Sequence, residues 1–270
     1  MKKFTVDENT NLRDFTDSVY PQGSFCLAQL LRNRDVKVNG TRVNKNVALS
    51  AGDEVIYYTT PKQEAMKSHE VVYEDENIYV ADKYSGVSSE ALFSELSERG
   101  GFYAVHRLDR NTQGLIIFSK TLVLKQVFLN VFKEREVQKT YIALCKNCFK
   151  TCKSVLVSCI KKDEKNALVK VYDRQIEGGM KIITEYKVLE DRGDIALVEI
   201  KLHTGRTHQI RAHMAHIGCP VLGDEKYGDS VLNAKYGVKR QCLVSKSLKF
   251  NLKGEYEYLN NLNLVSSFNL

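Results

Sequence analysis

Several features that would mark a membrane, secreted or nucleotide-dependent protein are missing from this sequence. No segment approaches the ~18 consecutive apolar residues that span a bilayer, and the opening MKKFTVDENT lacks the apolar core of a secretory signal. No glycine-rich phosphate loop is present, which disfavours enzymes that use a nucleotide cofactor. We therefore expect a cytoplasmic protein without a membrane partner.

Cysteines are present, but not in a regular metal-binding pattern. The chain has seven, an odd number, and without a secretory signal they are predicted to be reduced thiols. Cys145, Cys148, Cys152 and Cys159 lie close together, and a Cys-x-x-Cys pair can seed a zinc or redox site. Zinc sites usually pair two such units across a longer loop, and this spacing is irregular. We expect no metal here and keep a zinc protein as the weaker alternative.

The length and composition predict a sizeable folded core. The chain has 270 residues, 43% of them hydrophobic, enough for one large domain or for a medium domain with a small one. Its net charge of +7 favours a polyanionic partner without establishing one.

Residues 24–58 are predicted to form a small helix-and-sheet unit. Ser24 is expected to cap a helix, and Asn39-Gly40 supplies the positive-φ pair of a tight hairpin. Between residues 32 and 45, five basic residues stand against the single acid Asp35: Arg32, Arg34, Lys37, Arg42 and Lys45. They are either a solvated hairpin face or a ridge that binds phosphates.

Residues 61–70 contain Pro61 and many charges without an apolar period, so they are the predicted linker. A larger domain is expected to follow, over residues 71–270. Strands are predicted in VVYEDENIYVADK, GLIIFSK and KTYIALC, a helix in LVLKQVFLNVFKE, and two long strands in KIITEYKVLEDRGDIALVEIKLHTG. The pattern indicates a mixed sheet with many antiparallel neighbours.

Two polar clusters could carry chemistry. In HRLDR, Asp109 lies between basic residues, and a carboxylate held ionised suits nucleophilic attack or proton removal. Such a motif alone more often marks a salt-bridged loop.

The second cluster is HTGRTHQIRAHMAHIG, in which Thr207 is expected to cap a helix. The helix N-terminus beside Arg206 could seat a phosphate, and Arg211 lies at the edge of the apolar stripe. His208, His213 and His216 do not share one face, which argues against a metal.

Together these motifs resemble the RluA-type RNA pseudouridine synthases. HRLDRNTQGLIIFSKT, KTYIALC and TGRTHQIRAHMAHIGCPVLGDEKYG resemble that family's nucleophile, tyrosine and arginine motifs, in the family's order, and the likeness covers about residues 69–250. LLRNRDVKVNGTRVNKNVALSAGDEVIYY resembles the small alpha-L RNA-binding domain, over about residues 13–60. The sequence departs from the family at Thr112-Gln113-Gly114 and at Lys83-Tyr84-Ser85-Gly86.

The resemblance implies a role for each motif residue. Asp109 would be the essential carboxylate, Tyr141 would stack on the target base, and Arg211 would pair with Asp109. Arg107 would fill the space that the flipped-out uridine leaves. The reaction detaches uracil at N1 and reattaches it through C5, without a cofactor. Other RNA-contacting candidates are His106, Arg206, His208, Arg32, Arg34, Lys37 and Arg42.

The sequence therefore predicts an α/β protein of the α+β type. Residues 1–60 would form a small α+β RNA-binding domain, residues 61–70 a linker, and residues 71–270 a catalytic domain with a mixed, mainly antiparallel sheet. The expected function is isomerisation of uridines in structured RNA, ribosomal RNA rather than tRNA, by a monomer. The alternative is a non-catalytic RNA-binding protein that keeps the synthase fold.

Overall fold

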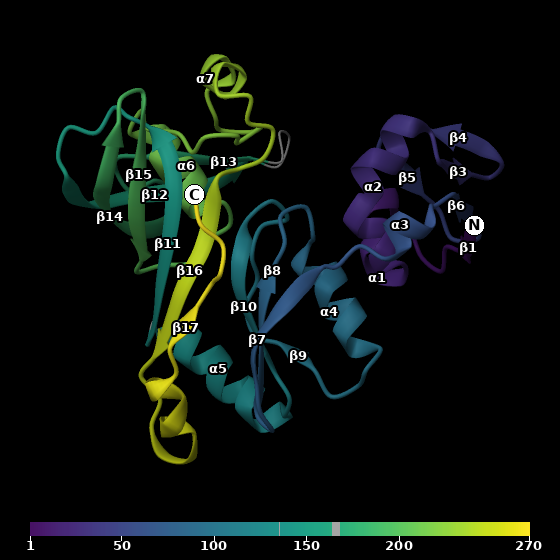
Figure 1. Cartoon of the computed structure of the whole chain (residues 1–270), viewed down its shortest axis with the longest axis horizontal. Helices are drawn as coiled ribbons and strands as arrows, with labels where there is room; N and C mark the ends of the chain where they lie inside the picture. Colours follow the sequence, from purple (N-terminus) through teal and green to yellow (C-terminus); the bar gives the residue numbers. More distant parts are fainter. Residues whose placement is uncertain (135, 164–167) are drawn as a thin grey trace.

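The computed structural model describes residues 1–134, 136–163 and 168–270. It shows a small N-terminal unit beside a larger α/β unit, in which long strands run through the centre (Figure 1). The mixed, mainly antiparallel architecture predicted from the sequence is confirmed.

The N-terminal unit has two helices packed on a small sheet. Its elements are β1 (Lys2–Thr5), β2 (Thr10–Asn11), α1 (Leu12–Val19), α2 (Pro21–Asn33), β3 (Val36–Val38), β4 (Thr41–Val43), β5 (Ala48–Leu49) and β6 (Glu54–Tyr57). The strand order is β1-β6-β3-β4, with β2 and β5 as a separate pair. The unit has its own apolar core around Leu12, Leu30 and Tyr57. Neither β1 nor α1 was predicted from the sequence.

Local sequence explains the hairpin but not the start of α2. Asn39 and Gly40 both have positive φ, 48° and 78°, as the predicted tight turn between β3 and β4 requires. The prediction that Ser24 caps the helix is wrong. α2 begins at Pro21, whose fixed φ suits the first helical turn, and Ser24 is buried inside the helix.

Regular structure enters the predicted linker from both ends. Helix α3 (Pro61–Glu64) has a capping box, in which the Thr60 hydroxyl accepts from the Gln63 amide while the Gln63 side chain accepts from the Thr60 amide. Strand β7 (His69–Glu74) begins before residue 70. The exact domain limits stay a prediction.

The larger unit is built on one long sheet. Its strands are β7, β8 (Ile78–Lys83), β9 (Tyr103–Ala104), β10 (Gln113–Ser119), β11 (Val137–Lys146), β12 (Lys153–Asp163), β13 (Leu168–Tyr172), β14 (Met180–Arg192), β15 (Ile195–Leu202), β16 (Leu243–Phe250) and β17 (Leu264–Val265). Its helices are α4 (Ser89–Ser97), α5 (Leu122–Glu134), α6 (Gln209–His216), α7 (Ser230–Lys235) and the 3₁₀ helix η1 (Gly254–Asn261).

Among the described strands the main order is β13-β12-β14-β15-β11-β16-β10-β8-β7, with β9 on β10 and β17 on β16. β10 and β16 pair in parallel, and the other pairs among the described strands of this sheet are antiparallel. This parallel pairing places the strand that follows the HRLDR loop next to the strand beside Tyr141.

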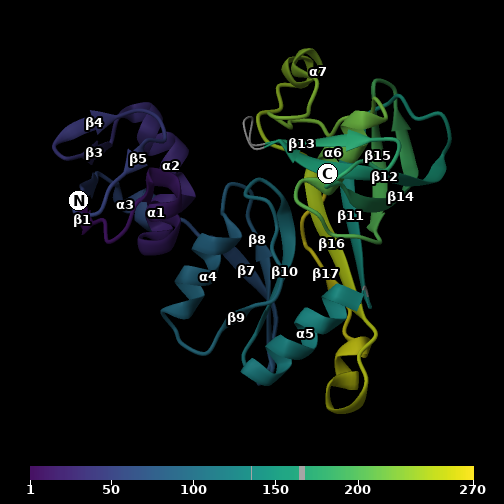
Figure 2. The ribbon, with the colours of Figure 1, turned by 180° about the vertical axis from the view of Figure 1, so that it is seen from behind.

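Both faces of β8 and β10 are covered by helices. Ile116 and Phe118 share a core with α4, whereas Leu115 and Ile117 share a core with α5, as the twofold period of a strand requires. Figure 2 shows α4 on the side of the N-terminal unit and α5 away from it. None of the described helices is long and apolar enough to cross a membrane.

The strands and the helix predicted in the larger domain are all present, as β7, β8, β10, β11, β14, β15 and α5. Their sequences carry a strong apolar period, and this local signal agrees with the final packing.

Candidate active site

The three family motifs meet at one cavity of about 400 Å³. Asp109 comes from the loop between β9 and β10, Tyr141 from β11 and Arg211 from α6, and all three side chains line the cavity. A volume in this range suits a small ligand or a single nucleobase with its sugar.

Asp109 and Arg211 form an ion pair across two of these elements. The Arg211 Nη1 donates to Asp109 Oδ2 at 2.8 Å. Arg211 is buried, whereas 21% of the Asp109 side chain is exposed to the cavity. The carboxylate is therefore held in one place by a cation and stays accessible to a ligand.

A second carboxylate, Asp224, fixes Arg211 from the opposite side. Arg211 Nε and Nη2 donate to the two oxygens of Asp224 at 2.7 and 2.9 Å, a bidentate geometry. Burial alone lowers the pKa of the Arg211 guanidinium, but the hydrogen bonds and charge of Asp224, with the charge of Asp109, raise it overall. Arg211 is thus a permanent cation, although it is buried.

Asp224 was missed as a site residue, although it lies in the quoted arginine motif. Its side chain is fully buried, and Oδ1 accepts from the amides of Lys226 and Tyr227 at 2.8 and 3.1 Å. Burial raises the pKa of this carboxyl, but Arg211 and these amides outweigh burial and lower it. The sequence signal was two adjacent acids, Asp224 and Glu225, after a glycine, which does not reveal the partner of either.

Tyr141 lies on β11 where the register with β16 shifts. Its ring is 7% exposed, and burial, together with the charge of Asp109, raises the pKa of its phenol to about 12. The hydroxyl is therefore neutral at physiological pH and able to donate a hydrogen bond or a proton. The ring lines the cavity, and a flipped-out base could stack on it there.

Buried polar groups hold the loop that carries Asp109. The hydroxyl of Ser89 accepts from the Leu108 amide and donates to the Leu108 carbonyl, both at 2.9 Å. The Thr112 amide donates to the Asp109 carbonyl at 3.1 Å, and the Gln241 side chain donates to the Thr112 hydroxyl at 2.6 Å. These contacts restrict where the Asp109 side chain can lie.

At the two places where the sequence departs from the family pattern, buried contacts still hold the loop that carries Asp109. Lys83 is fully buried, and its Nζ donates to the carbonyls of Tyr84, Val87 and Arg110 at 3.2, 2.6 and 3.0 Å. Gly114, after Gln113, has a φ of +109°, and a Cβ there would lie 2.4 Å from the carbonyl oxygen of Ser245. The parallel pairing of β10 with β16 thus requires glycine at this position.

The two residues before Leu108 have different surroundings. Arg107 lines the cavity mouth, is largely exposed, and pairs with Glu90 at 3.1 Å. His106 Nε2 accepts from the Ile117 amide at 3.0 Å, and burial lowers the pKa of this imidazole to about 3. One ring nitrogen of His106 is therefore hydrogen-bonded to the backbone of β10, although the ring lines the cavity.

The start of α6 differs from the prediction. The helix begins at Gln209, and its N-cap is His208 with φ +54°, so the expected Thr207 cap is wrong. The Gln209 side chain instead accepts from the Arg206 amide at 3.0 Å and from the Thr204 hydroxyl at 2.8 Å. These two contacts hold the turn that precedes the helix, and the N-cap residue His208 makes no side-chain capping hydrogen bond.

Arg206 and His208 both line the cavity, and Arg206 is exposed. His208 Nδ1 lies 2.9 Å from the Tyr227 hydroxyl, and its Nε2 lies 4.0 Å from Asp109 Oδ2. Burial lowers the pKa of His208.

Three further basic side chains of the cavity were not predicted from the sequence. Lys133, Lys139 and His203 also line the cavity. Burial lowers the pKa of Lys139, whose Nζ lies 5.5 Å from the centroid of the Phe132 ring. Lys139 precedes Tyr141 by two residues, and the twofold period of a strand was the signal that both face one side.

The predicted basic residues of the N-terminal unit do not line this cavity. Arg32 and Arg34 lie at the end of α2, and Lys37 and Arg42 face each other across β3 and β4. The Lys37 and Arg42 cations lie 5.6 and 5.3 Å from the centroid of the Tyr58 ring. We call Arg32, Arg34, Lys37 and Arg42 together the basic ridge.

The two other histidines considered as metal ligands, His213 and His216, contact polar side chains of the protein. His213 Nδ1 and Nε2 lie 2.9 and 3.1 Å from the hydroxyls of Thr184 and Ser158, and His216 pairs with Asp173. Among the described residues, no group of three or more His, Cys, Asp or Glu side chains is arranged to hold a metal ion.

The cysteine cluster is dispersed in the fold. Cys145 lies on β11 and Cys159 on β12, with β14 and β15 between them, and both are buried. Cys148 and Cys152 are exposed.

Comparison with known proteins points to one family. A family model described as RNA pseudouridylate synthase matches residues 61–216. A protein of Aquifex aeolicus named "Uncharacterized RNA pseudouridine synthase" is 33% identical over 258 residues, 84% of this chain and 79% of that protein. "Ribosomal large subunit pseudouridine synthase C" of Vibrio vulnificus is 30% identical over 250 residues, 82% of this chain and 78% of that protein.

A solved structure shares the architecture. "Human RNA Pseudouridylate Synthase Domain Containing 1" superposes with a TM-score of 0.61 at 27% identity, over 68% of this chain and 79% of that chain. The segment that the family model matches, residues 61–216, includes Asp109, Tyr141 and Arg211 and all the residues that line the cavity except Leu243. On this evidence the chain belongs to the RNA pseudouridylate synthase family, whose members are isomerases.

Proposed function

We propose that this chain converts uridines of ribosomal RNA to pseudouridine, with Asp109 as the reacting carboxylate. The observation that carries the proposal is the 2.8 Å ion pair that holds Asp109 at the cavity beside Tyr141. Relatives named for the large ribosomal subunit support this class of RNA as the substrate.

In this reaction the N1–C1′ bond of uridine breaks and a C5–C1′ bond forms. The C5 proton leaves to water, and N1 takes up a proton, so that the product is an isomer of uridine. An ionised carboxylate can attack C1′ or remove a proton, and the ion pair with Arg211 holds Asp109 in place for either step. The ring of Tyr141 would hold the detached uracil by stacking while it turns, and the neutral hydroxyl can pass a proton. No step in this scheme needs a cofactor.

Extraction of the base costs a few kcal/mol of unstacking, so a loop or a weakly paired uridine is the favoured target. Cations at the cavity, among them Arg107, Arg206 and Lys139, would bind the flanking phosphates. Arg107 at the mouth would fill the place that the extracted base leaves.

The test replaces Asp109 with Asn, which preserves size but removes the negative charge. Pseudouridine is mapped in total RNA from a strain without the gene and from strains that carry either version. We expect ribosomal sites that appear only with wild-type protein. Sites confined to tRNA would refute the choice of substrate, and the absence of any site that depends on Asp109 would refute the enzyme.

We also propose that the basic ridge binds RNA phosphates. Removal of each phosphate contact is expected to reduce the slope of log affinity against log salt by ~0.7–0.9. The variants Lys37→Gln and Arg42→Gln are compared with Lys3→Gln, which removes a cation from β1 of the same sheet. Equal slopes for all three variants would contradict the assignment.

A further inference from the structure

The N-terminal unit packs directly on the catalytic unit. Helices α1 and α2 both contact α4, which lies between the N-terminal unit and the large sheet (Figures 1 and 2). Phe25 of α2 belongs to the apolar core of the catalytic unit, and the Ser94 hydroxyl of α4 donates to the Ser18 carbonyl of α1 at 2.8 Å. The two units are thus joined by apolar and polar contacts.

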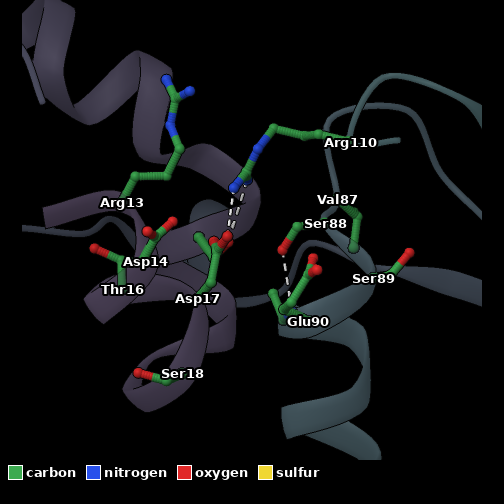
Figure 3. A network of polar contacts seen from close by, with 12 residues as sticks. Arg13, Asp14, Thr16, Asp17, Ser18, Val87, Ser88, Ser89, Glu90 and Arg110 are labelled. Carbon is green, nitrogen blue, oxygen red and sulfur yellow. Dashed lines mark hydrogen bonds and ion pairs between the residues drawn. The ribbon is translucent and has the colours of Figure 1, made fainter. Parts of the chain in front are cut away.

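One ion pair connects α1 with the loop that carries the catalytic carboxylate. Figure 3 shows the Arg110 side chain extended from that loop to Asp17 on α1. Arg110 Nη2 and Asp17 Oδ2 are 2.5 Å apart, and the second oxygen of Asp17 accepts from the Ser24 hydroxyl. Arg110 Nη1 also lies 3.4 Å from the carbonyl of Gly86 in the catalytic unit.

This pair is largely removed from water. The Asp17 side chain is 8% exposed and the Arg110 side chain 26% exposed. Within the described residues, Asp17 is the carboxylate that pairs with Arg110. Loss of one partner alone would leave the other charge unpaired in a poorly solvated place while the two units are docked.

Both neighbours of Asp109 in the chain are held by hydrogen bonds, and one of them, Arg110, also makes the ion pair with Asp17. On one side, the Arg110 carbonyl accepts from Lys83 Nζ at 3.0 Å and from the Gly86 amide at 2.9 Å. On the other side, both polar backbone groups of Leu108 bond to Ser89 at the start of α4. Asp109 lies between these two anchors and faces Arg211.

We propose that Asp17 of the N-terminal unit is a positioning residue for Asp109, acting through Arg110. This inference rests on the proposed function and extends it, because the N-terminal unit then shapes the catalytic loop as well as binding RNA. The Asp17–Arg110 ion pair fixes the loop at Arg110, and the pairing of Asp109 with Arg211 depends on that fixed loop. A misplacement of about 1 Å at a reacting group can cost roughly 100-fold in rate, so a small shift of the loop would have a large effect.

The first experiment measures the loop without reference to activity. Hydrogen exchange is followed at the Leu108 and Thr112 amides in wild-type protein, in Asp17→Asn and in Asp14→Asn. Asp14 is an exposed acid on the same helix, so its variant removes the same charge without touching the loop. We expect exchange at these amides to be roughly tenfold faster in Asp17→Asn alone. Unchanged exchange would overturn the proposal, as would equal acceleration in both variants.

The second experiment separates positioning from binding. The probe is bulk RNA from a strain without the gene, labelled with tritium at uridine C5, because the reaction releases that hydrogen to water. For Asp17→Asn we expect the single-turnover rate constant at saturating enzyme to fall roughly 10- to 100-fold, with less than about a twofold change in the half-saturating concentration. A change in half-saturation alone would show that the unit only binds RNA and would overturn the inference.

A double-mutant cycle tests whether Asp17 acts through Arg110. The variants are Asp17→Asn, Arg110→Gln and the combined variant. We expect the combined variant to lose no more rate than the worse single one, whereas additive losses would contradict the route through Arg110. If wild-type protein releases no tritium, the proposed function fails, and the exchange experiment still decides the positioning of the loop.

Discussion

The buried carboxylate Asp224 offers the sharpest test of how the site is built, through the substitution Asp224→Asn. Asp224 accepts two hydrogen bonds from Arg211, at 2.7 and 2.9 Å, and two from the amides of residues 226 and 227. An asparagine keeps an oxygen for the amides but points an NH₂ donor at the guanidinium. The buried Arg211 cation then retains Asp109 as its carboxylate partner.

The expected magnitude follows from these contacts. Charge-assisted hydrogen bonds contribute ~1.5–3 kcal/mol each, and removal of one partner of a buried ion pair costs ~3–5 kcal/mol. We therefore expect the free energy of unfolding to fall by about 3–5 kcal/mol, which for a chain of this size lowers Tm by on the order of 10 °C. Turnover should also fall at least about tenfold, because Arg211 no longer holds Asp109 in one geometry.

Denaturant unfolding followed by circular dichroism measures the first quantity, and pseudouridine formation measures the second. The matched control is Asp173→Asn, since Asp173 pairs with His216 of the same helix but its side chain is 89% exposed. An exposed pair contributes ~0–1 kcal/mol, so the control should change stability and turnover little. Equal effects of the two substitutions, or an unfolding change below about 1 kcal/mol for Asp224→Asn, would refute the reasoning.

Three further predictions concern the tyrosine, the glycine turn and a buried imidazole. Tyr141→Phe keeps the ring but removes the neutral hydroxyl. RNA affinity in a filter-binding assay should therefore stay the same, while the single-turnover rate should fall at least about tenfold. An unchanged rate would rule out a role for the hydroxyl. Gly114→Ala places a methyl against the Ser245 carbonyl at φ +109° and should destabilise the fold by about 2 kcal/mol or more in urea unfolding. Gly101→Ala, with positive φ but open space, should cost less, and the reverse order would contradict the packing argument. Burial lowers the pKa of His213 to about 4, so the unfolded chain binds more protons between pH 6.5 and about 4. Stability should fall by about 3 kcal/mol as the pH drops through that window, and His213→Asn should flatten this part of the profile measured by thermal unfolding.

Much of the fold could be predicted because its signals are local. The alternation of apolar residues in GLIIFSK and KTYIALC places those strands, and Asn39-Gly40 determines its hairpin through its positive φ angles. The errors fell where a long-range contact overrode a local cue. Ser24 has the chemistry of a helix cap, but Pro21 starts the helix and the Ser24 hydroxyl is used by Asp17.

The linker and the cap of α6 illustrate the same limit. A charged segment without apolar period proved to contain the capped helix α3, because one Thr60–Gln63 pair satisfies its first turn. At α6, the helix begins after His208 without a side-chain cap, and the Gln209 side chain holds the preceding turn through Thr204 and Arg206. Short elements of this kind depend on a few hydrogen bonds rather than on a hydrophobic period.

By itself, the sequence determined six strands of the large sheet, β7, β8, β10, β11, β14 and β15, and the three residues that deserved attention as a site: Asp109, Tyr141 and Arg211. Only the tertiary structure decided that Asp109 and Arg211, 102 residues apart, meet at 2.8 Å, and that Asp224 holds the arginine from behind. It also decided that Arg110 pairs with Asp17, 93 residues away. Periodicity and turn chemistry act over a few residues, whereas the partner of a buried charge is set by how distant strands and helices pack, and that packing is a property of the whole chain.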